Sequence, residues 1–229
     1  MAIYLLTFFI GATVASFLNV IARSLPINQN WWSRRSACPN CQIILRSTQL
    51  IPLISYSVQN GRCRHCQQQI PHRYFWVELV GGLLFITPLL LPQPNLLQAW
   101  LFIALLLTVT LTDLYYRLVP NKILIAFGVP LLLLQPEIVS AVTGFLFFLV
   151  TATFGKFLFK KETIGGGDIK LYFIIGLVLP IQPLLLSVVI ASGLALIYVF
   201  IFCQNKKQEI PFVPFIAAGS LLSYLLMFW

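Results

Sequence analysis

Charged side chains are scarce in this sequence, and their scarcity decides its class. Of 229 residues, only 9% are charged and 59% are hydrophobic, and the mean hydropathy is +0.90. A soluble domain usually carries about 25% charged residues. Intrinsic disorder, a nucleic-acid-binding module and an ordinary cytosolic enzyme are therefore excluded as descriptions of the whole chain. The repeated apolar runs instead predict an all-α integral membrane protein that crosses the bilayer several times.

Only one long stretch, residues 24–73, is polar enough to fold outside the bilayer. A spanning helix needs roughly 20 apolar residues. We expect eight transmembrane helices, near 3–22, 74–91, 96–112, 121–135, 138–159, 170–182, 183–203 and 212–229. The first has no basic residue before its long apolar core, which favours a retained helix over a cleaved signal peptide. The predicted organisation is a first transmembrane helix (1–23), a loop (24–73) and a seven-helix membrane domain (74–229).

Basic residues are missing from every second connection between these segments. All 15 lysines and arginines fall in four alternate connections, and none lies in the other three or at the termini. By the positive-inside rule, the four basic connections are cytoplasmic and both termini lie outside. The net charge of +9 is therefore a topology signal, with attraction to membrane lipid, and not a sign of nucleic-acid binding.

The cytoplasmic loop after the first helix carries two Cys-x-x-Cys pairs, separated by 21 residues. The pairs are Cys38 with Cys41 and Cys63 with Cys66. Four thiolates can complete a tetrahedral shell around Zn²⁺, and this spacing is close to that of known zinc sites. A loop of this length cannot bury a sizeable core, so a structural zinc ion would supply folding energy. Two disulfides or a redox pair are the alternatives, and a cytoplasmic location disfavours disulfides.

Acidic residues are the rarest charged type, with six in the chain, and three lie within or at the ends of apolar helices: Glu78, Asp113 and Asp168. An ionisable group there is costly and calls for a functional explanation. The predicted topology puts both aspartates at the cytoplasmic boundary, where a pair could share a proton and activate water. The glycine run before Asp168 would permit a sharp helix entry and close substrate approach.

Simpler roles for these acids remain open from the residues alone. Asp168 could be a helix N-cap, and Asp113 could pair with Arg117, four residues on. For Glu78 we expect a structural role, with Arg73 or Lys170 as its partner.

Several motifs, taken in chain order, resemble the bacterial type IV prepilin leader peptidases, many of which are also N-methyltransferases. The first part of the chain carries Gly11, Ala15-Ser16-Phe17-Leu18-Asn19-Val20, Arg23 and Pro26. The loop carries both cysteine pairs, Ile51-Pro52, Ser55-Tyr56, Gly61-Arg62, Tyr74 and Glu78-Leu79. The remainder carries Asp113 with Pro120-Asn121, the Gly-x-Gly-Asp-x-Lys motif (Gly165, Gly167, Asp168, Lys170), and Pro211-Phe212-Val213-Pro214.

This resemblance implies a membrane aspartyl endopeptidase of the bacterial cytoplasmic (inner) membrane with Asp113 and Asp168 as catalytic residues. Such an enzyme removes the basic leader from prepilins or pseudopilins on the cytoplasmic side and so serves type IV pilus, protein secretion or competence machinery indirectly. Bifunctional members then methylate the new N-terminus with S-adenosylmethionine. Here Ser47–Pro52 departs from the pattern of many members, and no glycine-rich nucleotide fingerprint follows a strand. We therefore assign no residues to S-adenosylmethionine.

Three other classes share part of the pattern. Presenilin-like and preflagellin-type membrane aspartyl proteases have Gly-x-Gly-Asp but not the double cysteine loop. A transporter could use intramembrane carboxylates as a proton or cation site. A non-enzymatic assembly scaffold could use the zinc loop for docking. A cleavage assay with a pilin-like peptide separates the peptidases from the other two classes.

Overall fold

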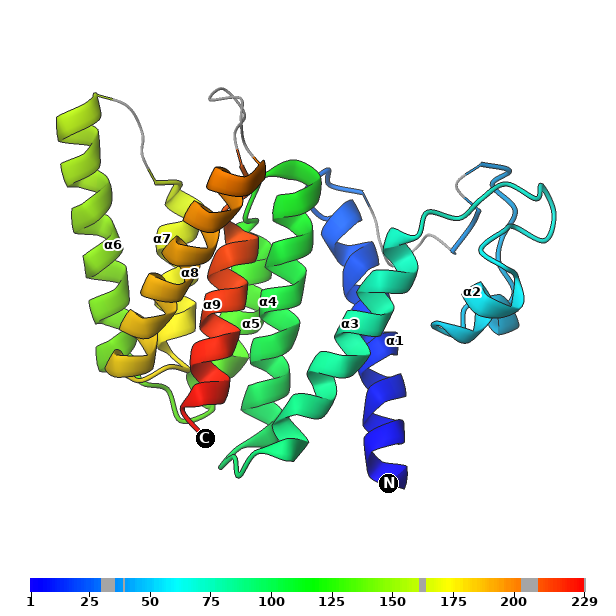
Figure 1. Cartoon of the computed structure of the whole chain (residues 1–229), viewed down its shortest axis with the longest axis horizontal. Coiled ribbons are helices and arrows are strands. Elements are labelled where there is room, and N and C mark those ends of the chain that lie inside the picture. The colour runs from blue at the N-terminus through cyan, green and yellow to red at the C-terminus, as the bar shows by residue number, and fades with distance from the viewer. Residues whose placement is uncertain (30–35, 39, 161–163, 203–209, 229) are drawn as a thin grey trace. The chain divides into compact units, whose positions relative to one another are not determined.

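The chain is all-helical apart from its loops, as predicted, in the computed structural model described here (Figure 1). The structure describes residues 1–29, 36–38, 40–160, 164–202 and 210–228. Two of the loop arginines, Arg34 and Arg35, lie outside the described residues. The chain folds as two compact units, Met1–Leu90 and Leu91–Trp229. The finer division into 1–23, 24–73 and 74–229 stays a prediction.

The first unit is built on two long helices that approach each other closely. Helix α1 (Ala2–Ser24) packs against α3 (Arg73–Ile86), which continues as the 3-10 turn η2 (Thr87–Leu90). Glycines permit the approach, since a Cβ on Gly81 would lie 2.2 Å from the Cβ of Ala15. Small residues at such contacts are typical of membrane helix pairs. The loop between the two helices holds only the short helices η1 (Ser47–Gln49) and α2 (Ile54–Val58) among its described residues.

The second unit contains six helices in its described part. They are α4 (Leu96–Tyr116), α5 (Asn121–Leu133), α6 (Ile138–Phe159), α7 (Gly166–Gly176), α8 (Ile181–Phe202) and α9 (Val213–Leu226). Helix α4 forms the interior of this unit. In its most apolar 18-residue stretch 61% of the residues are buried, against 17% in the corresponding stretch of α8. The exposed apolar side chains on the outer helices fit a lipid environment, where no polar coat is needed.

Each of the eight predicted segments contains a helix, and five of the helices in the described residues are long and apolar enough to cross a membrane: α1, α3 with η2, α4, α6 and α8. The chain is therefore a multi-pass membrane protein. Helices α5, α7 and α9 are shorter, with 13, 11 and 14 residues. The largest shift concerns the segment predicted at 170–182, because α7 begins at Gly166 and ends at Gly176, before the turn that leads to Pro180.

Candidate active site and metal centre

Asp113 lies in the last turn of α4, and its side chain is only 6% exposed. The helix ends three residues later, at Tyr116, and Arg117 then adopts a left-handed conformation (φ 53°) and donates its backbone N–H to the Asp113 carbonyl oxygen at 2.8 Å. The Asp113 carboxylate accepts a hydrogen bond of 3.1 Å from the backbone N–H of Val213, the first residue of α9. The free N–H groups and positive dipole end of a helix stabilise such a carboxylate.

Asp168 lies in the first turn of α7 and is half-buried. It is not the N-cap of this helix, because Gly165 occupies that position and no side chain caps it. Asp113 and Asp168 lie close enough for their negative charges to interact. The C-terminal end of α4 and the N-terminal ends of α7 and α9 lie at the same end of this unit (Figure 1). Two carboxylates brought together in this way favour a state that shares one proton.

Contacts with the α4–α5 connection hold the start of α7 in place. A Cβ on Gly167 would lie 2.9 Å from the Cβ of Val119, so the connection packs directly on this glycine. The Lys170 ammonium donates a hydrogen bond of 3.1 Å to the side-chain oxygen of Asn121, the first residue of α5. The Pro-Asn pair and the Gly-x-Gly-Asp-x-Lys motif are thus in direct contact.

The glycine run does not use the backbone freedom that we expected of it. Gly165 has a φ of −67°, and the only described glycine with a positive φ is Gly61. A Cβ on Gly165 would lie 3.5 Å from a carboxylate oxygen of Asp168, which is an ordinary contact distance, and one on Gly166 would meet nothing within 4 Å. In this structure the run matters for close packing at Gly167 and for open space beside Asp168.

The four cysteines lie on two tight turns with the same geometry. Cys38 donates its N–H to the Ile43 carbonyl, and Cys63 does the same to that of Gln68, each at 3.0 Å. Each turn contains a glutamine in the left-handed region with φ 56°, Gln42 or Gln67. The sequence therefore folds each Cys-x-x-Cys pair into a tight loop that presents both sulfurs to one side.

The sulfur atoms of the two turns form a single cluster. All four lie within 4.8 Å of one another, with Cys38–Cys66 at 3.8 Å and Cys41–Cys63 at 3.9 Å. Zn–S bonds of about 2.3 Å in a tetrahedron place sulfurs about 3.8 Å apart, so the cluster fits a tetrahedral metal ion. All four are free thiols, so the alternative of two disulfides is not what the structure contains.

The surroundings of the sulfurs shift the pKa values of Cys66 and Cys41 in opposite directions. The backbone N–H of Gln68 is the main influence that lowers the pKa of Cys66 to about 6, helped by the side-chain amide of Asn40. Although Cys41 accepts from the Ile43 N–H, burial and the neighbouring thiols raise its pKa to about 11. Four thiolates at this spacing repel one another, and a divalent cation relieves the repulsion.

Glu78 has a structural setting, in which its two hydrogen bonds come from residues other than the predicted Arg73 and Lys170. Its carboxylate accepts from the Ser16 hydroxyl of α1 at 2.8 Å and from the Leu53 N–H at 2.9 Å. Leu53 is the N-cap of α2 and has a φ of 62°. Glu78 therefore joins both long helices of the first unit to the loop, an arrangement that depends on the folded loop and leaves no signal in sequence spacing.

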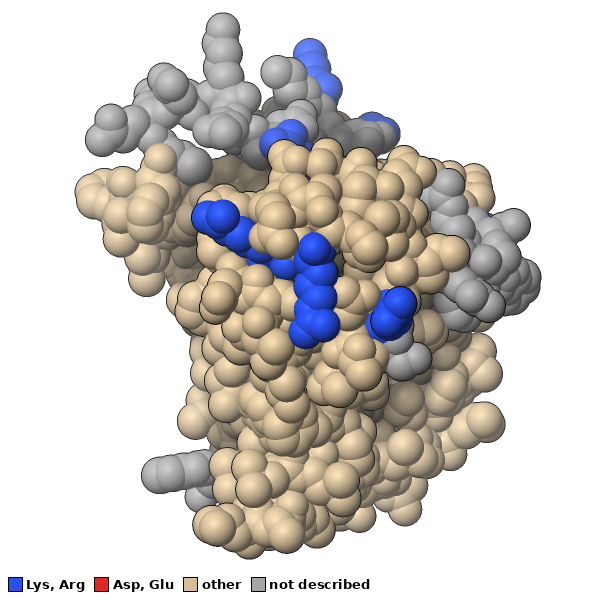
Figure 2. Space-filling view, turned by 90° about the vertical axis from the view of Figure 1, so that its right-hand side faces the viewer, with Lys and Arg blue, Asp and Glu red and all other residues tan. Residues whose placement is uncertain are grey.

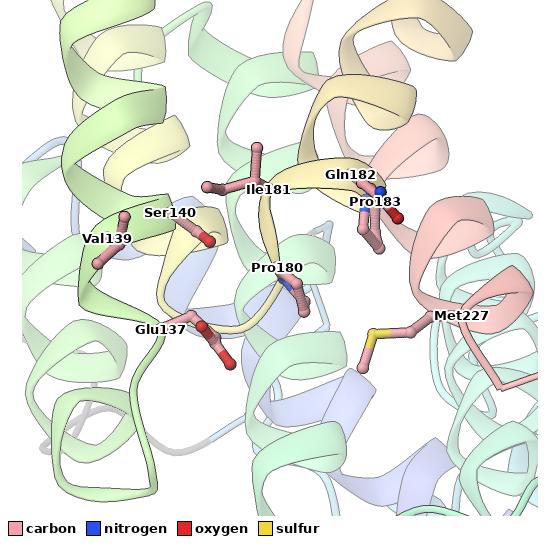
Figure 3. A pocket seen from close by; sticks show the side chains of 8 residues that line it. All are labelled: Glu137, Val139, Ser140, Pro180, Ile181, Gln182, Pro183 and Met227. Atoms are coloured by element: carbon pink, nitrogen blue, oxygen red, sulfur yellow. The ribbon is translucent and has the colours of Figure 1, made fainter.

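A separate cavity of about 400 Å³ opens among Glu137, Ser140, Gln182, Met227 and their neighbours (Figure 3). It lies near the C-terminal end of α9, whereas Asp113 contacts the N-terminal end of that helix. Glu137 is the single acidic residue that lines it. The cavity therefore lacks the carboxylate pair and belongs to the opposite end of this unit.

Sequence reasoning did not predict the contact between Asp113 and Val213 or the support that Asn40 gives to Cys66. A backbone N–H carries no residue identity, although Pro214, in the first turn of α9, is a known signal for a helix start. Asn40 lies between the cysteines of the first pair, in the variable part of the motif.

Comparison with known proteins matches two families to successive parts of the chain. Residues 9–91 match the Bacterial Peptidase A24 N-terminal domain, and residues 100–200 match the Type IV leader peptidase family. The first region contains all four cluster cysteines, and the second contains both aspartates.

Curated relatives match over nearly the full chain. A prepilin leader peptidase/N-methyltransferase of Bacillus subtilis (strain 168) is 35% identical over 95% of this chain and 92% of its own length. Proteins of the same name from Burkholderia pseudomallei (strain 1026b) and Aeromonas hydrophila are 30% and 28% identical, over 92% and 96% of this chain and 81% and 89% of their own lengths. No solved structure matches the chain.

Proposed function

Because the chain belongs to the type IV leader peptidase family, we propose that it is a membrane aspartyl endopeptidase that removes the leader from prepilins or pseudopilins. The relatives that support this substrate class carry the name prepilin leader peptidase/N-methyltransferase. The structural observation that supports the proposal most is that Asp113 and Asp168, from different helices, lie at one end of the second unit (Figure 1), close enough for their charges to interact.

The proposed mechanism is direct attack by water, without a covalent intermediate. Asp113 is taken as the ionised partner, because its carboxylate accepts the hydrogen bond from the Val213 N–H. Asp168 has the charge of Asp113 as its neighbour and carries the shared proton. Asp113 takes a proton from water while Asp168 donates its own to the scissile carbonyl oxygen. The tetrahedral intermediate then collapses: one of its hydroxyls returns a proton to Asp168, the C–N bond breaks, and the amine leaves with the proton held by Asp113.

The proposed location is the bacterial cytoplasmic membrane, with both termini outside and the aspartates toward the cytoplasm. The distribution of lysine and arginine along the sequence supports this orientation. The apolar segment of a prepilin would then lie against the transmembrane helices, and its basic leader would remain in the cytoplasm. The products would serve pilus or secretion assembly machinery indirectly.

In the loop (24–73) we propose a structural Zn²⁺ held by Cys38, Cys41, Cys63 and Cys66. The sulfur spacing and the soft donor set support zinc. When bound, zinc cross-links the two turns and supplies folding energy that this small loop cannot obtain from an apolar core.

A second proposed activity is methylation of the new N-terminus, because the relatives' shared name includes N-methyltransferase. S-adenosylmethionine would supply the methyl group. The described residues include no strand followed by a glycine-rich turn and helix, so they do not fit the usual nucleotide fingerprint. No residue of this chain is assigned to the cofactor.

The peptidase proposal predicts that Asp113→Asn and Asp168→Asn each abolish leader cleavage while the protein still inserts into membranes. Removal of either carboxylate eliminates one proton transfer, a loss of at least about 100-fold. The measurement is incubation of membranes with a prepilin and labelled S-adenosylmethionine, with leader loss and methyl transfer scored separately. Glu137→Gln, the same change in an exposed acid outside the site, is the matched control and should cleave normally.

Normal cleavage by either aspartate variant would remove the dyad proposal. An intact prepilin after incubation with the unmodified protein would instead favour a transporter or an assembly scaffold.

A further inference from the structure

The described part of the loop between α1 and α3 is cationic and carries no acid. In residues 36–70 the charged side chains are Arg46, Arg62 and Arg64, and all three are exposed. Figure 2 looks onto the side of the molecule at the right of Figure 1; blue basic residues appear there and no red acidic one. The whole loop, 24–73, also has no aspartate or glutamate. Its arginines outnumber the two net negative charges of a zinc ion with four thiolates, so the loop stays positive with metal bound.

The same segment exposes large apolar side chains. Ile44 is 55% exposed, Ile54 46% and Val58 64%, and Ile43, Leu50 and Ile51 are between 39% and 45% exposed. Its buried residues include Cys38 and Cys63, at 5%, together with Gly61. The centre of this segment is thus the sulfur cluster, which leaves no room to bury the isoleucines. So many exposed apolar side chains mark an interaction surface.

The chain itself places this segment at a bilayer. It follows α1, which ends at Ser24, and precedes α3, which begins at Arg73, and both helices are long and apolar enough to span. Glu78, on the second turn of α3, also accepts the backbone N–H of Leu53, just before α2. Residues 50–58 are therefore fixed beside the membrane entry of α3, within reach of lipid headgroups.

We propose that residues 36–70 are a membrane-docking module that binds anionic phospholipid headgroups. Arg46, Arg62 and Arg64 meet the phosphates, and the apolar side chains around α2 enter the headgroup boundary. A surface that combines basic and apolar side chains and has no acids binds well to an anionic lipid interface, because the basic groups attract the phosphates and the apolar groups enter the headgroup boundary. The basic leader expected of a prepilin fits it poorly, because like charges repel. The inference concerns the loop alone and stands apart from the proposed peptidase reaction.

The test uses the full chain, loaded with zinc, in nanodiscs of phosphatidylcholine alone or mixed with phosphatidylglycerol. Backbone hydrogen exchange is measured over residues 43–58. We expect exchange to be about tenfold slower in the anionic bilayer, and the difference to shrink at high salt, which screens exposed charges. The variant Arg46→Gln/Arg62→Gln/Arg64→Gln should lose most of this tenfold difference, because each arginine adds to the attraction to anionic headgroups.

Two controls separate lipid binding from misfolding. The triple variant must retain the zinc content of the unmodified protein. Lys160→Gln removes one exposed positive charge outside the loop and should keep the full lipid-dependent protection. A second variant, Ile54→Ser/Val58→Ser, should reduce the protection although all arginines remain.

Three results would overturn the proposal. Equal exchange in neutral and anionic bilayers would remove the charge argument. Equal protection in detergent micelles would mean that another part of the chain covers the segment. Protection that rises with the number of chains in each nanodisc would identify a second copy as the partner.

Discussion

At Gly167 the absence of a side chain is a packing requirement, whereas at Gly166 it is not. A Cβ on Gly167 would lie 2.9 Å from that of Val119, and one on Gly166 would lie in open space. We predict that Gly167→Ala displaces the start of α7 and lowers peptidase activity about tenfold, in line with about 1–3 kcal/mol for overpacking. Initial rates of leader cleavage at equal protein amounts measure the effect.

Gly166→Ala is the matched control. Alanine also favours a helix by about 0.5–1 kcal/mol over glycine, so this variant should cleave within about twofold of the unmodified protein. The contrast explains why the Gly-x-Gly-Asp pattern leaves its second position free. Equal losses in both variants would show that backbone freedom, not packing against Val119, is what the run provides.

Residue chemistry predicted which side chains matter better than it predicted what they contact. The cysteine cluster was foreseeable because paired cysteines have few other uses in a reducing compartment. The aspartates stood out because acids in apolar helices are rare. The Val213 N–H that holds Asp113 and the Leu53 N–H that holds Glu78 are backbone donors. Their positions depend on how α9 and α2 dock, which no local pattern specifies.

Among the helices, α8 and α9 pack with backbone almost in contact. A Cβ on Gly219 would lie 2.6 Å from the Ser187 carbonyl oxygen and 2.8 Å from the Ala191 nitrogen. Because backbone atoms cannot move aside as a side chain can, Gly219→Ala should cost about 1–3 kcal/mol of stability. It should also move the N-terminus of α9 from Asp113 and reduce cleavage. Thermal unfolding in detergent and cleavage rates measure the two effects.

Gly193→Ala, on the same α8–α9 pair of helices, has nothing within 4 Å of the added atom and serves as the control. It should leave both the unfolding temperature and the cleavage rate unchanged. A Gly219→Ala protein as stable as this control would mean that α9 packs on α8 less closely than the structure has it.

The two cysteine turns form an element whose stability should depend on metal. We predict that Cys38→Ser lowers bound zinc and protein abundance more than it alters the rate of peptide-bond cleavage per folded molecule, because zinc supplies folding energy here. Metal analysis of purified protein, with immunoblots of membranes, provides the measurement. Cys203→Ser, which changes the one cysteine outside the two pairs, should keep full zinc content. Purified unmodified protein without zinc would contradict the assignment.

The helices were predictable from apolar runs alone, and their ends were less so. All eight expected segments contain helices, since only a helix satisfies backbone groups in lipid. We expected one segment to begin only at residue 170, because three consecutive glycines predict a loop. The helix in fact begins at Gly166. Gly166 and Gly167 are therefore part of the helix, and Gly167 packs against Val119. Tertiary contact overrides a weak local propensity at this point.

Over the whole molecule, the proposed membrane orientation rests on the asymmetric distribution of charge. In the second unit, Arg117, Lys122 and Lys170 lie at the same end of the unit as the two aspartates (Figure 1). Glu137 lies at the other end of α6 from Lys160. Helix α6 has 22 residues. At about 1.5 Å per residue it spans about 33 Å, enough to cross a hydrocarbon core of about 30 Å.

Positions 137 and 160 should therefore lie on opposite sides of the membrane. In a Cys203→Ser background, we predict that a membrane-impermeant maleimide labels Glu137→Cys in intact spheroplasts and labels Lys160→Cys only after permeabilisation. Labelling of the Cys203→Ser protein without a further substitution measures the contribution of the four loop cysteines, which is subtracted. The reverse pattern would turn the protein over and place the aspartates outside, where a cytoplasmic leader could not reach them. Labelling of both positions from one side would mean that α6 does not span, and the positive-inside argument would then lose the helix count on which it rests.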